Sequence, residues 1–176
     1  MDNSFFAYLQ QLELMAFFSA YPLVYAIVSV LTGNSKKEIF VRLPSLLPYA
    51  YALVGTLYLG LQLKNLYPDY SSENIRLTLQ QPLLTIWALL SLLLWIPILA
   101  RKPVISLLHS FVFFFFLLRD LFSQFFASST DKNIVRNEMK VYTDSLLLNL
   151  GTFAFIVLLY FLFILYRKRI NSKASD

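Results

Sequence analysis

Residues 145–166, SLLLNLGTFAFIVLLYFLFILY, carry no charged side chain and are followed at once by Arg167, Lys168 and Arg169. At ~1.5 Å per residue, a helix of this length reaches ~33 Å, which is enough to cross the ~30 Å hydrocarbon layer of a membrane. The basic residues directly after it are typical of a helix end at the membrane surface. The stretch therefore predicts a transmembrane helix.

The rest of the chain has a composition that suits the same environment. The 176 residues are 58% hydrophobic and 14% charged, whereas an average soluble domain is about 45–50% apolar and about 25% charged. Apolar runs separated by short polar links predict spans at about 15–32, 45–63, 82–100, 104–126 and 145–166. We expect an all-α, polytopic transmembrane helix bundle with five spans, in which residues 1–176 form a single integral membrane domain. The alternative is four spans plus one re-entrant or interfacial helix.

The first apolar run has three features of its own. Its first turn or two carries apolar residues at helical spacing opposite Gln10, Gln11 and Glu13, which indicates a helix at the membrane interface ahead of the span. Glu13 is then either a solvated acid or a carboxylate folded over a polar cluster on the outer side. Pro22 is expected to kink the span without breaking it, because neighbouring helices can satisfy the carbonyl that it frees.

Lys and Arg residues predict the orientation of the bundle. They are densest in the links at 33–44 and 101–103 and after residue 166, which places these three segments on the cytoplasmic side. The N-terminus is then outside and the C-terminus cytoplasmic, as an odd number of spans requires. We expect a multi-pass protein of the plasma membrane or of a bacterial inner membrane.

Several classes of function lack the residues that they need. The chain has no cysteine and one histidine, which excludes thiolate catalysis, iron–sulfur clusters and zinc sites built on Cys or on several His. Its four glycines match no phosphate-binding loop or dinucleotide motif. The basic residues lie at the ends of apolar runs and not on one polar face, which argues against nucleic acid as a partner. We therefore assign no catalytic, cofactor or metal-binding residue, and we expect no enzyme.

The fourth span carries the strongest candidate site. On a helix, its polar residues fall within one arc of about 100°, which we expect to face the protein interior. These residues are Ser106, His109, Ser110, Asp120 and Gln124. Ser106 and His109 resemble a nucleophile and base, but Asp120 lies ~16 Å farther along the helix and cannot orient the imidazole. In the fifth span, Ser145, Asn149 and Thr152 share a face and are expected to meet Asp120 and Gln124 if the two spans are neighbours.

Two hypotheses follow from this polar face. Ionisable residues inside a span are costly, at about 2.5–3.5 kcal/mol on insertion scales, and they normally have a partner or a function. In the first hypothesis the polar residues hold neighbouring spans together, and the chain is a structural or accessory subunit with other membrane subunits, or further copies of itself, as partners. In the second they form a path for protons, cations or a small polar solute, with His109 near mid-depth and Asp120 at the outer mouth.

Overall fold

The structure is a computed structural model that describes residues 3–33, 42–72, 75, 79–126 and 132–173. All regular elements in these ranges are helical, as the sequence predicts. In chain order they are α1 (Asn3–Phe18), α2 (Tyr21–Gly33), the 3₁₀ helix η1 (Leu43–Leu46), α4 (Leu47–Leu66), α6 (Pro82–Leu89), the 3₁₀ helix η2 (Leu90–Trp95), α7 (Pro97–Ala100), α8 (Pro103–Phe126) and α9 (Lys132–Lys173).

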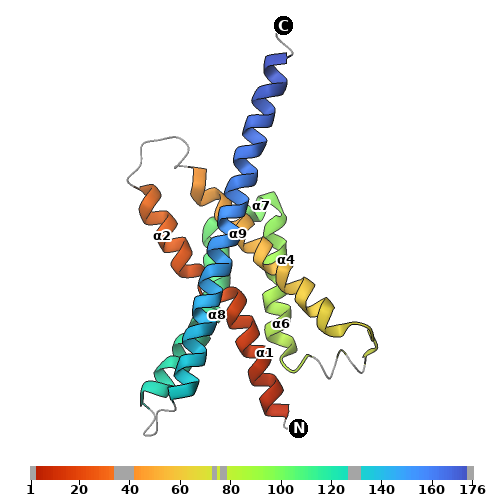
Figure 1. Ribbon diagram of the computed structural model, residues 1–176, viewed down its shortest axis with the longest axis vertical. Helices are drawn as coiled ribbons and strands as arrows, with labels where there is room; N and C mark the ends of the chain where they lie inside the picture. Colours follow the sequence, from red (N-terminus) through yellow and green to blue (C-terminus); the bar gives the residue numbers. More distant parts are fainter. Residues whose placement is uncertain (1–2, 34–41, 73–74, 76–78, 127–131, 174–176) are drawn as a thin grey trace.

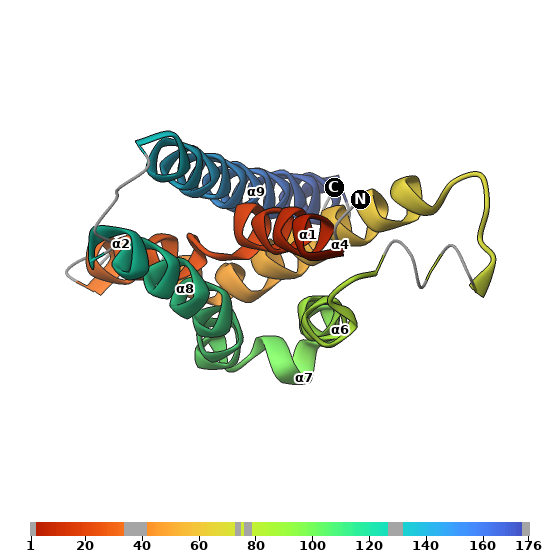
Figure 2. The same cartoon turned by 90° about the horizontal axis from the view of Figure 1, so that it is seen from below.

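The chain runs back and forth between two ends of the bundle (Figure 1). The helices α1 and α2 lead from the lower end to the upper end, α4 returns, α6 to α7 lead up again, α8 descends and α9 ascends, so that the two termini lie at opposite ends. Seen from below, α1 lies in the middle of the bundle (Figure 2), where it contacts α4, α6, α8 and α9. The N-terminal helix is therefore a central element of the fold.

Four helical segments are long and apolar enough to cross a membrane. They are Ala7–Gly33, Leu43–Leu66, Pro103–Phe122 and Met139–Ile170. They coincide with four of the five predicted spans. The segment predicted as a span over residues 82–100 instead contains a shorter apolar helix, Pro82–Trp95. It changes from α to 3₁₀ geometry at Leu90 and is interrupted at Ile96, whose extended backbone (φ −73°, ψ 120°) is the conformation that a following proline favours.

The first apolar segment is part of a longer helical segment, Ala7–Gly33, so the two turns expected at the membrane interface are continuous with the predicted span. Leu14 and Phe18 of α1 are completely buried in the core. In addition, the helix is broken at Ser19 and Ala20, whereas we expected a kink without a break. Pro22 has no N–H to continue the hydrogen-bond ladder of α1, and the chain starts a second helix there.

The core lies where the first segment crosses α4 and α8, and its largest buried side chains are aromatic. Phe18 stacks on Phe113 of α8 with 4.9 Å between ring centroids, and Tyr21 packs against Tyr51 of α4 at 4.3 Å. One turn farther along α4, Gly55 lies directly against Ser91 of η2, and a Cβ atom at position 55 would overlap the serine side chain. The absence of a side chain at this point allows η2 to approach α4 closely.

Candidate functional site

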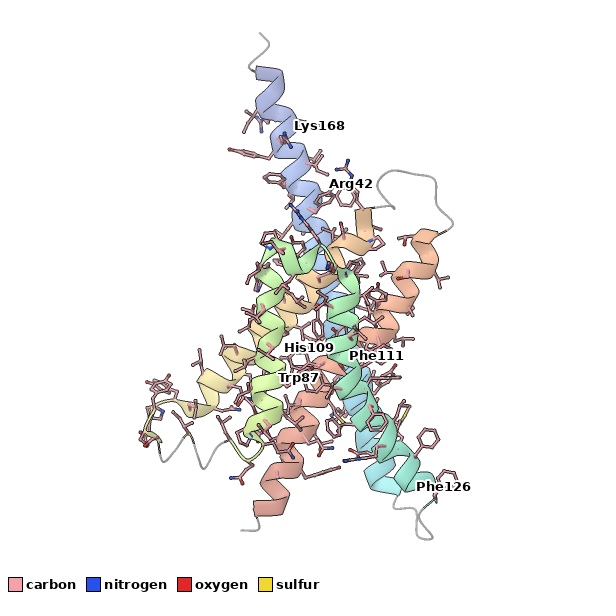
Figure 3. All side chains as sticks on the ribbon, turned by 180° about the vertical axis from the view of Figure 1, so that it is seen from behind. Arg42, Trp87, His109, Phe111, Phe126 and Lys168 are labelled. Atoms are coloured by element: carbon pink, nitrogen blue, oxygen red, sulfur yellow. The ribbon has the colours of Figure 1, made fainter. Side chains whose placement is uncertain are left out.

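The polar face predicted on α8 points into the bundle. Ser106 and Ser110 are both 0% exposed, and His109 and Asp120 are partly buried. Phe111 and Phe115 on the opposite face are exposed, and Figure 3 shows Phe111 on the outer surface of the helix. The helical periodicity of α8 thus divides an apolar surface from a polar one, as the sequence predicts. Gln124 lies on α8, but its side chain is outside the described part of the structure.

Tyr21, Tyr51, Trp87, Ser106 and His109 form what we call the central cluster, which joins α2, α4, α6 and α8. The Ser106 Oγ donates to the carbonyl oxygen of Pro103 at 2.6 Å, which uses its one proton. The Tyr21 hydroxyl, 2.7 Å from Ser106 Oγ, must then be the donor in that pair. Both side chains are buried, and each proton has an acceptor.

His109 is bonded through both of its ring nitrogens. Its Nε2 lies 2.7 Å from the carbonyl oxygen of Trp87, and because a carbonyl only accepts, this nitrogen carries the proton. Its Nδ1 lies 2.9 Å from the Tyr51 hydroxyl and, in the neutral ring, accepts from it. The arrangement suits a neutral imidazole that connects α4 to α6, with no ring nitrogen left for another ligand.

Trp87 and His109 bind each other reciprocally. The Trp87 Nε1 donates to the carbonyl oxygen of His109 at 3.3 Å, while the histidine side chain donates to the carbonyl oxygen of Trp87. The two rings are stacked, with centroids 5.0 Å apart and planes 4° from parallel. Trp87 is 38% exposed, so the stacked pair lies at the edge of the bundle (Figure 3). This pair fixes α6 against α8 in position and in rotation.

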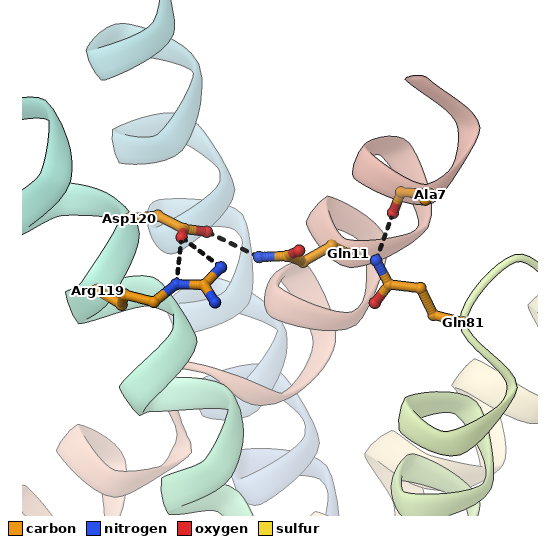
Figure 4. A network of polar contacts seen from close by, with 5 residues as sticks. All are labelled: Ala7, Gln11, Gln81, Arg119 and Asp120. Atoms are coloured by element: carbon orange, nitrogen blue, oxygen red, sulfur yellow. Dashed lines mark hydrogen bonds and ion pairs between the residues drawn. The ribbon is translucent and has the colours of Figure 1, made fainter. Parts of the chain in front are cut away.

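Three neighbouring polar residues of α1 each reach a different helix, and we call this group and its partners the lower polar layer. Gln11 donates to Asp120 of α8 at 2.8 Å, and Asp120 also accepts from Arg119 at 2.9 Å (Figure 4). Gln10 donates to Thr85 of α6 at 3.0 Å and accepts from the backbone N–H of Gln81 at 2.7 Å. Glu13 accepts from Gln62 of α4 at 3.5 Å. The Gln81 side chain closes the layer by donating to the carbonyl oxygen of Ala7 at 3.0 Å (Figure 4).

The polar face of α9 meets the break between α1 and α2. Asn149 donates to the carbonyl oxygen of Phe17 at 2.8 Å, and Ser145 accepts from the backbone N–H of Ala20 at 3.1 Å. Thr152 donates to the carbonyl oxygen of Asn149 at 3.0 Å. A neighbouring helix therefore satisfies two backbone groups at the break, the Phe17 carbonyl and the Ala20 N–H, and not the Phe18 carbonyl that Pro22 frees. The other expectation, that Asn149 and Thr152 join Asp120, differs from these contacts, because the α1–α2 break takes up their polar groups.

The sequence patterns assign Gln10, Tyr58, Gln62 and Thr85 to no site. These residues are spread over α1, α4 and α6, so no pattern within one helix marks them as a group. The only available signal was the presence of glutamine side chains in runs otherwise suited to lipid. No family model, curated protein or solved structure matches this chain. Any assignment of function therefore depends on the contacts described above.

Proposed function

We propose that this is a five-pass membrane protein that acts as a non-enzymatic structural or accessory subunit. The five passes are supported by two polar levels in the bundle. Lys102 directly precedes α8 at the upper end, and Asp120 lies in the lower polar layer, eighteen residues farther along the chain, which corresponds to ~27 Å. This distance is close to the ~30 Å thickness of the hydrocarbon layer.

Residues 82–100, which contain the shorter apolar helix, also connect these two polar levels. This segment begins beside Gln81 in the lower polar layer and ends at Arg101 at the upper end. A 3₁₀ helix rises ~2.0 Å per residue against ~1.5 Å for an α-helix, so α6 and η2 together rise about 24 Å. The change of geometry at Leu90 thus lengthens a helix that is otherwise too short, which supports residues 82–100 as the third of five passes.

The charges at the two ends support the orientation. At the upper end, Arg42, Arg101, Lys102 and Arg167–Arg169 are exposed, and the described residues there include no Asp or Glu (Figure 3). At the lower end, basic residues are mixed with Asp69 and Asp120. By the positive-inside rule the upper end, with the C-terminus, is cytoplasmic, and the N-terminus is outside. The membrane is then the plasma membrane or a bacterial inner membrane.

The accessory role rests on one observation: both ring nitrogens of His109 are bonded to neighbouring helices. A proton or solute path needs groups that can exchange partners, whereas the protons of Ser106 and Tyr21 are directed to acceptors within the bundle. The surface left uncovered is apolar. Only 11% of the apolar window of α9 is buried, which leaves that helix free to contact lipid, another membrane subunit or a second copy of the chain.

The number of passes can be tested by labelling single introduced cysteines, because the sequence contains none of its own. Single variants Ser71→Cys, in the lower link, and Ser172→Cys, near the end of α9, each provide one thiol. A membrane-impermeant maleimide applied to intact cells should label position 71, and should label position 172 only after permeabilisation. Labelling of both positions in intact cells, or of neither, would refute the five passes.

The accessory role has a separate test. Purification in a mild detergent should yield the chain with a stoichiometric membrane partner or as a defined oligomer. Vesicles containing the purified chain should show no flux of protons or Na⁺ above that of empty vesicles. A flux that His109→Ala abolishes would instead support the channel or carrier.

A further inference from the structure

The upper end of α9 carries two basic residues on the same face that packs against η1 and α4 nearer the middle of the helix. Phe153, Ile156 and Tyr160 belong to this packed face. At ~100° per residue, Arg167 and Lys168 fall on the same face, seven and eight residues beyond Tyr160. Both are exposed, and Arg167 is two turns, or ~10.5 Å, above Tyr160. Two cations therefore lie directly above the contact between α9 and α4.

Arg42 approaches this face of α9 from the start of η1. Its Nη1 donates to the Tyr160 hydroxyl at 3.4 Å, and that hydroxyl keeps a proton for which the described residues show no acceptor. Figure 3 shows Arg42 beside α9 and Lys168 farther up the same helix. The described residues at this end include no Asp or Glu. Three cations and one hydroxyl thus lie along one side of α9. We call this group the upper basic site, and its members are Arg42, Tyr160, Arg167 and Lys168.

The position of the upper basic site matches that of a lipid headgroup above its acyl chains. Leu158 and Leu159, just below the site, are 56% and 44% exposed, so this part of α9 presents an apolar surface. The headgroup region is about 5–8 Å thick on each side of a membrane. Arg42 lies at its lower limit and Arg167 above it, and long basic side chains extend readily toward the interface. A soluble acidic peptide or a nucleic acid would leave the leucines uncovered.

We propose that the upper basic site binds the headgroup of one anionic phospholipid of the phosphatidylglycerol class, whose acyl chains lie along α9. The phosphate accepts hydrogen bonds from the Arg42 guanidinium and the Tyr160 hydroxyl, because bonds between arginine and phosphate are charge-assisted. Arg167 and Lys168 add attraction from above. A zwitterionic phospholipid has the same phosphate but also a cation of its own, which these residues repel. The proposal rests on the membrane location of the chain, but not on the number of passes, the orientation or the accessory role.

The test is native mass spectrometry of the full chain in detergent, with phosphatidylglycerol or phosphatidylcholine added. We expect one molecule of phosphatidylglycerol to bind more tightly than phosphatidylcholine. One basic residue near an anionic lipid changes the affinity about fivefold. Arg42→Gln should therefore raise the apparent Kd for phosphatidylglycerol about fivefold, and Arg167→Gln combined with Lys168→Gln should raise it about 25-fold.

Arg101→Gln is the matched control. Arg101 is an exposed cation at the same end of the molecule, but it follows α7, and α7 and α9 lie on opposite sides of α1 and α4 (Figure 2). This variant should bind phosphatidylglycerol as the original protein does. Equal losses for Arg101→Gln and Arg42→Gln would overturn the proposal, because general surface charge would then explain the binding.

Three other results would also overturn it. The first is equal affinity for phosphatidylcholine and phosphatidylglycerol, and the second is displacement of the lipid by inorganic phosphate. The third is unchanged phosphatidylglycerol binding by the variants at positions 42, 167 and 168. If those variants instead lose a co-purifying acidic protein, the surface binds that protein and not a lipid.

Discussion

The hydrogen bond between Tyr51 and His109 gives the sharpest test of how the bundle is held together. Tyr51 is completely buried, and its hydroxyl lies 2.9 Å from His109 Nδ1. Hydrogen bonds between helices of membrane proteins contribute about 0.6 kcal/mol on average and at most about 1.7 kcal/mol. Tyr51→Phe should therefore lower the free energy of unfolding by about 1 kcal/mol, because it also leaves Nδ1 without a donor.

His109→Phe keeps a ring that can stack on Trp87 but removes both ring nitrogens. It should cost about 1–2 kcal/mol, because the bonds to the Tyr51 hydroxyl and to the carbonyl oxygen of Trp87 are lost together. In the double variant the tyrosine hydroxyl and the imidazole are absent at once. Its cost should be lower than the sum of the two single costs by about 0.6–1.7 kcal/mol, which is the coupling energy of the pair.

The assay is reversible unfolding in mixed micelles of a mild detergent and SDS, followed by circular dichroism. Tyr25→Phe is the control, because the Tyr25 ring packs 6.3 Å from Tyr21 while its hydroxyl makes no hydrogen bond within the described residues. This variant should leave the stability within about 0.5 kcal/mol of the original. Costs of Tyr51→Phe and His109→Phe that add to within about 0.3 kcal/mol would refute the bond.

Three further predictions concern other contacts of the bundle, all measured as free energies of unfolding. Gly55→Ala should destabilise the protein by about 1–3 kcal/mol, because the new methyl group overlaps Ser91. Gly60→Ala is the control and should be neutral or stabilising, because nothing lies within 4 Å of the added methyl group. Equal effects of the two variants would contradict the close approach of η2 to α4. Asn149→Ala should cost about 1–3 kcal/mol, because it leaves a buried carbonyl at the α1–α2 break without its donor, and a loss below about 0.5 kcal/mol would show that another group replaces it. Asp120→Asn should cost at most about 1 kcal/mol, because its ion-pair partner is half-exposed and the amide oxygen can still accept from Gln11; a larger loss would place the acid in a more critical role.

The general architecture was predictable because it depends on properties that are local in the sequence. Apolar runs of sufficient length, bounded by proline and basic residues, identified four segments that the structure shows as long apolar helices. The inward face of α8 was equally accessible, since helical periodicity places Ser106, His109 and Ser110 on one side. Each of these predictions requires only the spacing of residues within one segment.

The details that sequence analysis missed depend on contacts between segments. The break at Ser19 and Ala20 forms where α9 supplies Asn149 and Ser145, and neither residue can be related to the break by its position in the sequence. Likewise, η2 adopts 3₁₀ geometry where it lies in close contact with Gly55 of α4, a residue of another segment. Local propensity cannot anticipate either feature, because tertiary packing commonly overrides it.

Only the α8 residues of the candidate site were predictable from the sequence. The donors and acceptors of α8 were identified, but their partners Tyr51, Trp87 and Gln11 lie on three other helices. Glu13 was expected to be solvated or to cover an outer polar cluster with Asp120. It accepts a hydrogen bond from Gln62 of α4, on a different side of α1 from the contact between Gln11 and Asp120. One helix sequence does not specify which neighbour each of its polar residues will meet.

The 3₁₀ geometry of η2 also restricts how this segment can change in length. With about three residues per turn, side chains three positions apart lie in line along the helix. Leu90 and Leu93 accordingly share the outer edge, while Ser91 and Leu94 share the inner one. Inserting or deleting a single residue here rotates everything beyond it by about 120°, which turns leucine toward Gly55 or serine toward lipid. Natural variation in the length of this segment should therefore occur in steps of three residues.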